Sequence, residues 1–86
     1  MNSTIKGTIK AAQELMENRR ITRWCNMFSY VVEISHHDGS HLIFQNATSK
    51  IRWIHGQRML LVWTEHCGYH VFFTEDLEMW RKYETI

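Results

Sequence analysis

Residues 27–45 read MFSYVVEISHHDGSHLIFQ, and this stretch decides the fold. On both sides of His37-Asp38-Gly39, apolar residues alternate with less apolar ones, which is the pattern of two half-buried strands joined by a turn. Directly opposed residues of a hairpin share a face of the sheet, so the length of the turn sets the register. The stretch therefore predicts an antiparallel hairpin whose turn length can be tested against its pattern.

A three-residue turn keeps one face of this hairpin apolar. With His37-Asp38-Gly39 as the turn, Ile34 pairs with Leu42 and Val32 pairs with Phe44, whereas a two-residue turn would set apolar residues against polar ones. The glycine then takes the position that needs a left-handed backbone, which glycine adopts without strain. This register also brings three polar residues together on the opposite face, namely Glu33, Ser35 and His41.

The residues before the hairpin carry the pattern of an amphipathic helix. Apolar side chains recur at spacings of four, three and four through Ile5, Ile9, Ala12 and Met16. These spacings place them on one face of a helix. The pattern predicts a helix over about residues 4–20 that lies against another element.

The residues after the hairpin continue the sheet and then change character. Residues 58–65 are apolar on both faces, which is typical of a central strand, and 69–73 form the last strand. Residues 50–54 either add a short strand or belong to a connection, so the sheet has five strands or four. Thr74, followed by two acidic residues, has the character of a helix N-cap. The apolar residues that follow are at helical spacing, namely Leu77, Trp80 and Tyr83. Together with the N-cap, this spacing predicts a closing helix over about 75–84.

These elements predict a single α+β domain over residues 1–86. An antiparallel meander over about 27–73 has an N-terminal and a C-terminal helix on one of its faces, and such a two-layer arrangement leaves the other face open. The chain has 86 residues, is 44% hydrophobic and contains no proline. That length allows one domain, and the composition excludes disorder and a disulfide-rich scaffold.

Charge and hydropathy restrict the class of protein. The net charge is only +1, which does not favour a nucleic-acid partner. The longest apolar run, 59–63, is far shorter than the about 20 residues that a membrane-spanning helix needs. Two cysteines form no disulfide framework, and the N-terminus lacks the apolar core of a secretory signal. The sequence therefore predicts a cytoplasmic protein with no membrane contact.

Six histidines, all between residues 36 and 70, offer a zinc-binding alternative. In a four-strand meander the turns at 36–41 and 66–70 would meet at one end of the sheet, and imidazole is a common zinc ligand. The candidate ligands are His36, His37, His41, His66, Cys67 and His70. No close ligand spacing such as Cys-x-x-Cys is present, so no metal or other cofactor is expected. No nucleophile has an evident orienting base, so no catalytic residue is expected and the protein is predicted not to be an enzyme.

Basic residues next to aromatic ones support a second alternative, a nucleic-acid-binding domain. Three such runs, Arg23-Trp24, Arg52-Trp53 and Trp80-Arg81-Lys82, combine charges that neutralise phosphates with rings that stack on bases. The cluster at residues 19–23 could contact phosphates or an acidic protein through Arg19, Arg20 and Arg23. Cations at the end of a helix also complement its dipole and are ordinarily solvated.

The preferred hypothesis is a non-enzymatic protein-binding module. The open sheet face, the near-neutral charge and the abundance of tryptophan, tyrosine, methionine and arginine suit a protein interface. Small domains of this kind often act as inhibitors or accessory proteins, of the type that phages and plasmids encode, and bind a larger protein; a homodimer is the other form of partner. The candidate contact residues are Val31, Glu33, His41, Ile43, Arg52, Trp53 and His55.

Overall fold

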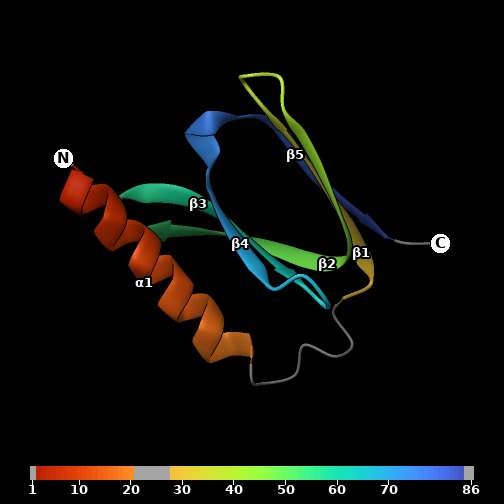
Figure 1. Ribbon diagram of the computed structural model, residues 1–86, viewed down its shortest axis with the longest axis horizontal. Coiled ribbons are helices and arrows are strands. Elements are labelled where there is room, and N and C mark those ends of the chain that lie inside the picture. The colour runs from red at the N-terminus through yellow and green to blue at the C-terminus, as the bar shows by residue number, and fades with distance from the viewer. Residues whose placement is uncertain (1, 21–27, 85–86) are drawn as a thin grey trace.

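In the part of the chain that the structure describes, one α-helix, a short 3-10 helix and a five-stranded antiparallel sheet make up the fold (Figure 1). The computed structural model describes residues 2–20 and 28–84. The sheet has the strand order β4-β3-β2-β1-β5, so β4 and β5 are its two edges. In chain order the elements are α1 (Asn2–Arg20), β1 (Tyr30–His36), β2 (His41–Ile54), β3 (Gln57–Thr64), β4 (Tyr69–Phe73), the 3-10 helix η1 (Thr74–Asp76) and β5 (Leu77–Glu84).

The β1–β2 hairpin has the predicted register. Ile34 pairs with Leu42 and Val32 pairs with Phe44. The amide of His36 donates to the carbonyl of Ser40 at 2.9 Å, which closes a three-residue turn over 37–39. Gly39 has a φ of +95°, a conformation that would strain any residue with a side chain. The prediction of a three-residue turn is confirmed.

Strand β2 is longer than predicted and changes faces along its length. Residues 41–45 and 50–54, which the sequence pattern separates, belong to this one strand. Its first half pairs with β1 and its second half pairs with β3. Between the halves the register with β1 shifts, because β2 carries one extra residue there, and Asn46 has a φ of +51°. Such a bulge reverses which positions face inward, so Phe44 and Ala47 both pack in the inner core.

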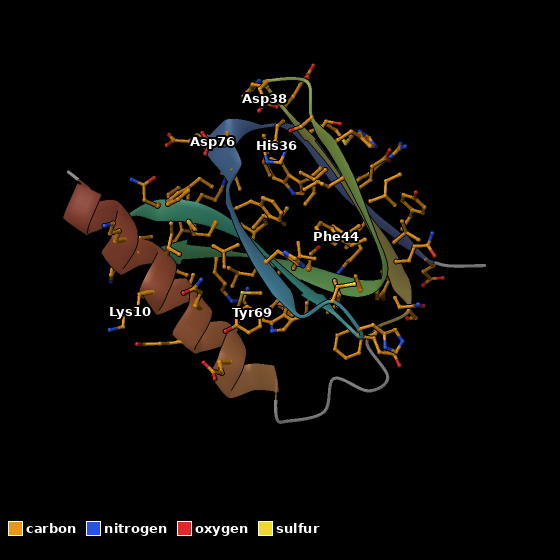
Figure 2. The ribbon with its side chains drawn as sticks, in the orientation of Figure 1. Lys10, His36, Asp38, Phe44, Tyr69 and Asp76 are labelled. Atoms are coloured by element: carbon orange, nitrogen blue, oxygen red, sulfur yellow. The ribbon has the colours of Figure 1, made fainter. Side chains whose placement is uncertain are left out.

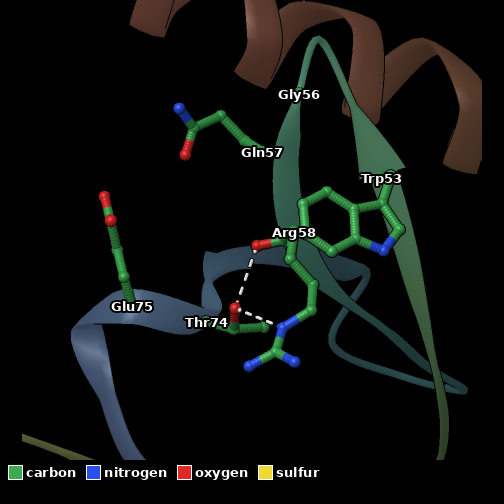
Figure 3. Close-up of a pocket in the computed structure, with 6 residues that line it drawn as sticks. All are labelled: Trp53, Gly56, Gln57, Arg58, Thr74 and Glu75. Atoms are coloured by element: carbon green, nitrogen blue, oxygen red, sulfur yellow. Dashed lines mark hydrogen bonds between the residues drawn. The ribbon is translucent and has the colours of Figure 1, made fainter.

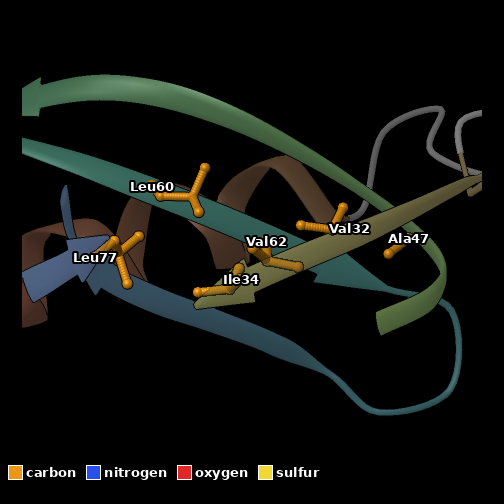
Figure 4. Close-up of a cluster of buried hydrophobic side chains, with 6 residues drawn as sticks. All are labelled: Val32, Ile34, Ala47, Leu60, Val62 and Leu77. Carbon is orange, nitrogen blue, oxygen red and sulfur yellow. The ribbon is translucent and has the colours of Figure 1, made fainter. Parts of the chain in front are cut away.

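The sheet curls around its inner face. The flat distance between the two edges of a five-stranded sheet is about 19 Å, but the connection from Phe73 to Leu77 can span at most about 14 Å. Because this short connection joins the two edge strands, the sheet has to curve. The side chains enclosed by the curve form the inner core (Figure 4), made of Val32, Ile34, Ala47, Leu60, Val62 and Leu77.

Helix α1 covers the outer face of β3 and β4 (Figure 1). Ala12 and Met16 are buried against Met59, Leu61 and Trp63, which form a second core outside the curl. Strand β3 therefore supplies buried side chains to both faces, as predicted from its continuous apolar run. The helix is confirmed, and of its predicted apolar positions Ala12 and Met16 are buried and Ile9 is half-buried, while Thr8 is buried beside them.

The predicted C-terminal helix over 75–84 is wrong, and with it the arrangement of two helices on one face. At this end of the chain only the 3-10 helix η1 is helical. The residues that follow it form β5, which pairs with β1 along its length. The register shifts between Ser35 and His36, so a bulge lies in β5 at Glu78. This bulge lets Leu77 and Trp80 both face inward although they are three residues apart. The helix-like spacing of these two residues is therefore the product of a bulged strand.

Candidate functional site: an open face of the sheet

Helix α1 leaves part of the outer face of the sheet uncovered. The uncovered part lies over β1, β5 and the first half of β2, away from α1 (Figure 1). We call it the open face, and cross-strand pairing arranges it in three rows. The rows are His41–Ser35–Met79, Ile43–Glu33–Arg81 and Val31–Tyr83. Ile43 and Tyr83 are 54% and 44% exposed, which makes them two of the large apolar side chains most accessible to a partner.

A hydrogen-bonded ion network occupies the centre of the open face. Arg81 Nε donates to one carboxylate oxygen of Glu33, and His41 Nε2 lies 2.9 Å from the other. Nδ1 of His41 lies 2.9 Å from Ser35 Oγ. The hairpin register alone placed Glu33, Ser35 and His41 together, and the structure confirms this grouping. Arg81 was singled out in the sequence only as part of a basic and aromatic run, and its place beside Glu33 was missed because it falls in the segment that the spacing assigned to a helix.

The network keeps Glu33 ionised. The hydrogen bond and the positive charge of Arg81 lower the pKa of Glu33, with a smaller contribution from His41, against the opposing effect of partial burial. In the folded protein this carboxyl group therefore holds its proton less tightly than in the unfolded chain. By linkage, this difference contributes to stability wherever the group is ionised in both states.

We expect the Glu33→Gln substitution to remove a pH-dependent part of the stability. The contribution of Glu33 is fully present above the ordinary glutamate pKa of about 4.3, and it is lost as the pH falls through the lowered pKa of the folded state. Urea unfolding of both proteins between pH 7 and pH 2.5 should show wild type more stable at neutral pH and the two converging in acid. Asp38, whose pKa Ser40 also lowers, is present in both proteins and cancels in the difference. A difference that does not change with pH would contradict this role of Glu33.

Three of the predicted contact residues lie away from the open face. The bulge at Asn46 places Trp53 on the inner side of the sheet, where it is 71% exposed. His55 lies in the β2–β3 turn, and its Nδ1 is 3.2 Å from Thr8 Oγ1 of the helix. Arg52 Nη1 donates to the carbonyl of its neighbour Ile51 at 2.9 Å. The structure therefore keeps Val31, Glu33, His41 and Ile43 together and separates these three from them.

A pocket of about 300 Å³ lies where the β2–β3 turn meets η1 (Figure 3). Thr74 Oγ1 accepts a hydrogen bond from Arg58 Nε at 3.0 Å and donates one to the Arg58 carbonyl at 3.2 Å. These two hydrogen bonds fix Arg58, which pairs with Trp53 across the strands and whose guanidinium carbon lies 5.5 Å from the centre of the Trp80 ring. Such a basic and aromatic pair is the type on which the nucleic-acid alternative rests, and that alternative stays a prediction. The lining residues are Trp53, Gly56, Gln57, Arg58, Thr74 and Glu75.

The histidines do not gather at one end of the sheet. The β3–β4 turn, which contains His66 and Cys67, lies beside the middle of the long β2, where the Glu65 amide donates to the Asn46 carbonyl. His41 belongs to the open face, and His37 is exposed in the first turn. In the described ranges, 2–20 and 28–84, no three or more His, Cys, Asp or Glu residues form a group that could hold a metal ion.

The two remaining histidines point into the curl of the sheet. His36 packs edge-on against Phe72, with ring centroids 5.7 Å apart, and the ring of His70 lies 4.7 Å from that of Phe44. Figure 2 shows His36 and Phe44 on this inner side. Buried nitrogens of both rings, Nδ1 of His36 and Nε2 of His70, have no hydrogen-bond partner within the described part of the chain. Their contacts are with aromatic rings, as expected of core packing.

The predicted basic cluster lies outside the residues whose side chains the structure describes. This applies to Arg19, Arg20 and Arg23 alike, and the role predicted for them stays a prediction. Trp24 and Cys25 are outside the described residues as well.

Comparisons with known proteins give no further assignment. No known protein family matches the sequence, and no curated protein or solved structure matches it. Among the described helices, none is long and apolar enough to cross a membrane. The geometry of the described residues is therefore the basis for the function proposed below.

Proposed function

We propose that this protein is a small protein-binding module and that the open face is its contact surface. The observation that carries the proposal is that, among the described residues, α1 packs over β3 and β4 and leaves Ile43 and Tyr83 exposed. Single exposed apolar residues are ordinary on protein surfaces. Here two of them flank an ordered ion network on the same sheet face. Tyrosine and arginine are also the residue types that most often dominate binding energy at protein interfaces.

The geometry favours binding over catalysis. Ser35, His41 and Glu33 form a chain of the kind that links a nucleophile, a base and an orienting acid. However, the chain lies on the outer surface of a sheet, and substrate sites are normally concave. The pocket in Figure 3 and a second one, lined by His36, His37, Asp38 and Asp76, both lie elsewhere. A non-enzymatic module, acting as an inhibitor or accessory protein by covering a surface of a larger partner, fits this arrangement.

The proposal predicts that one substitution on the open face strongly weakens partner capture. Immobilised wild-type protein should recover a protein partner from a lysate of the native host, and Ile43→Asp should reduce the recovery about 30-fold, as expected for a hot-spot residue worth about 2 kcal/mol. Trp53→Ala removes a more exposed apolar side chain outside the open face and is the matched control, which should capture normally. Light scattering on both variants distinguishes a homodimer from a different partner.

Two results would contradict the proposal. One is recovery of nucleic acid with no protein, which would favour the alternative based on neighbouring basic and aromatic residues such as Arg52-Trp53. The other is equal capture by wild type and Ile43→Asp when circular dichroism shows both to be folded. That outcome would remove the open face from the interface.

A further inference from the structure

We infer that the partner presents a carboxylate to Arg81, framed by apolar side chains that cover Ile43 and Tyr83. The inference rests on the proposed function, because it states the chemistry of the partner at the same open face. The charged side chains of the central network differ in their exposure to solvent. Glu33 is recessed, with only 12% of its side chain exposed, whereas Arg81 is 63% exposed and His41 is 44% exposed. The network therefore exposes the guanidinium of Arg81 to a partner and keeps the carboxylate of Glu33 beneath it.

Arg81 is held in a conformation that suits recognition. Its Nε is bound to Glu33, and its guanidinium carbon lies 5.5 Å from the centre of the Tyr83 ring. Its two terminal nitrogens have no hydrogen-bond partner among the described residues. An arginine fork held in this way loses less conformational freedom on binding, and its geometry matches the two oxygens of a carboxylate.

The cost of covering the open face selects the chemistry of the partner. A wholly apolar surface would bury the free nitrogens of Arg81 without an acceptor, which is strongly unfavourable. A basic surface would be repelled by the exposed cation. A carboxylate supplies both the acceptor and the opposite charge. Ile43, directly across from Glu33, and Tyr83, next to Arg81 on the same face, then require apolar partners.

A protein carboxylate fits the open face better than a phosphate backbone does. Nucleic acids present rows of phosphates, so their binding proteins supply several cations. Among the residues of the open face, Arg81 is the one that is permanently positive, and Glu33 lies directly against it. A single acidic side chain within an apolar surface matches this distribution of charge.

Three capped tripeptides test the inference by NMR titration of the full chain. Each has a central residue between a leucine and a phenylalanine, and the central residue is glutamate, glutamine or lysine. The glutamate peptide should shift the Arg81 Nε–H signal and the Ile43 and Tyr83 amides, and should bind about threefold more tightly than the glutamine peptide, the size expected of an exposed ion pair. This preference should disappear in Arg81→Gln and weaken in Arg81→Lys, which keeps the charge but loses the fork.

The outcomes separate this inference from the proposed function. If the three peptides bind the open face with equal affinity, the inference that the partner presents a carboxylate is wrong, although the open face remains a binding surface. If the glutamate peptide shifts only signals outside the open face, both proposals are wrong. If an oligothymidylate shifts the Arg81 signal more strongly than the glutamate peptide does, the acceptor is a phosphate and the inference is overturned. The spectrum of Arg81→Gln without peptide shows whether the variant is folded.

Discussion

Replacing Trp63 by alanine is expected to lower the free energy of unfolding by about 3–5 kcal/mol, the range measured when a buried aromatic side chain is removed. Trp63 is only 2% exposed and packs between the sheet and α1, where it shares a core with Ala12 and Met16. Its ring nitrogen donates to the carbonyl of Met16 at 3.2 Å. The substitution therefore removes both apolar contact and the hydrogen bond that ties the helix to β3.

A second tryptophan gives a matched control for this prediction. Trp53 is 71% exposed, so Trp53→Ala should change the stability by no more than about 0.5 kcal/mol. Trp63→Phe keeps a ring but loses the donor, and should cost about 1–2 kcal/mol. Urea unfolding followed by far-ultraviolet circular dichroism measures all three. If Trp63→Ala does not fold, Trp63→Phe still tests the contact, and equal stability of Trp63→Phe and wild type would contradict it.

Replacing Leu60 by alanine is expected to cost about 2–5 kcal/mol. Leu60 is 1% exposed and belongs to the inner core, where it packs with Val32, Ile34 and Leu77. These residues come from three different strands, β1, β3 and β5, so the cavity would weaken the contact that holds the sheet in its curl. Stability totals only about 5–15 kcal/mol in proteins of ordinary size, so the expected loss is a large share of it.

Leu42 is the matched control for Leu60. It lies on the same inner side of the sheet, near the first turn, but is 39% exposed. Leu42→Ala should therefore cost less than about 1 kcal/mol. Thermal unfolding monitored by calorimetry compares the two variants with wild type. A similar loss of stability in both variants would contradict the placement of Leu60 in the inner core.

Local patterns predicted the elements that depend on neighbouring residues. The alternation on both sides of Gly39 gave the correct hairpin register, and that register was enough to place Glu33, Ser35 and His41 together. The continuous apolar run of residues 59–63 correctly indicated a strand buried on both faces. These predictions succeeded because the period of a strand and the glycine requirement of a turn are properties of a few adjacent residues.

Bulges limited the sequence-based prediction of the site. Trp53, His41 and Ile43 all hold odd-numbered positions on β2. Strict alternation of side chains would therefore place all three on one face of the sheet. The extra residue at Asn46 reverses the alternation and moves Trp53 to the other side. A bulge depends on how the partner strand pairs, and nothing in the local composition marked this asparagine as the point of reversal.

By itself, the sequence determined an amphipathic first helix, a central strand buried on both faces and a hairpin with one polar cluster, since each follows from a short-range period. Only the tertiary structure decided that residues 77–84 are a strand, because β1 offers them an edge to pair with that local spacing does not reveal. The same pairing decided the composition of the open face. Arg81 meets Glu33 across 48 positions of the chain, and that contact exists only once β5 lies beside β1.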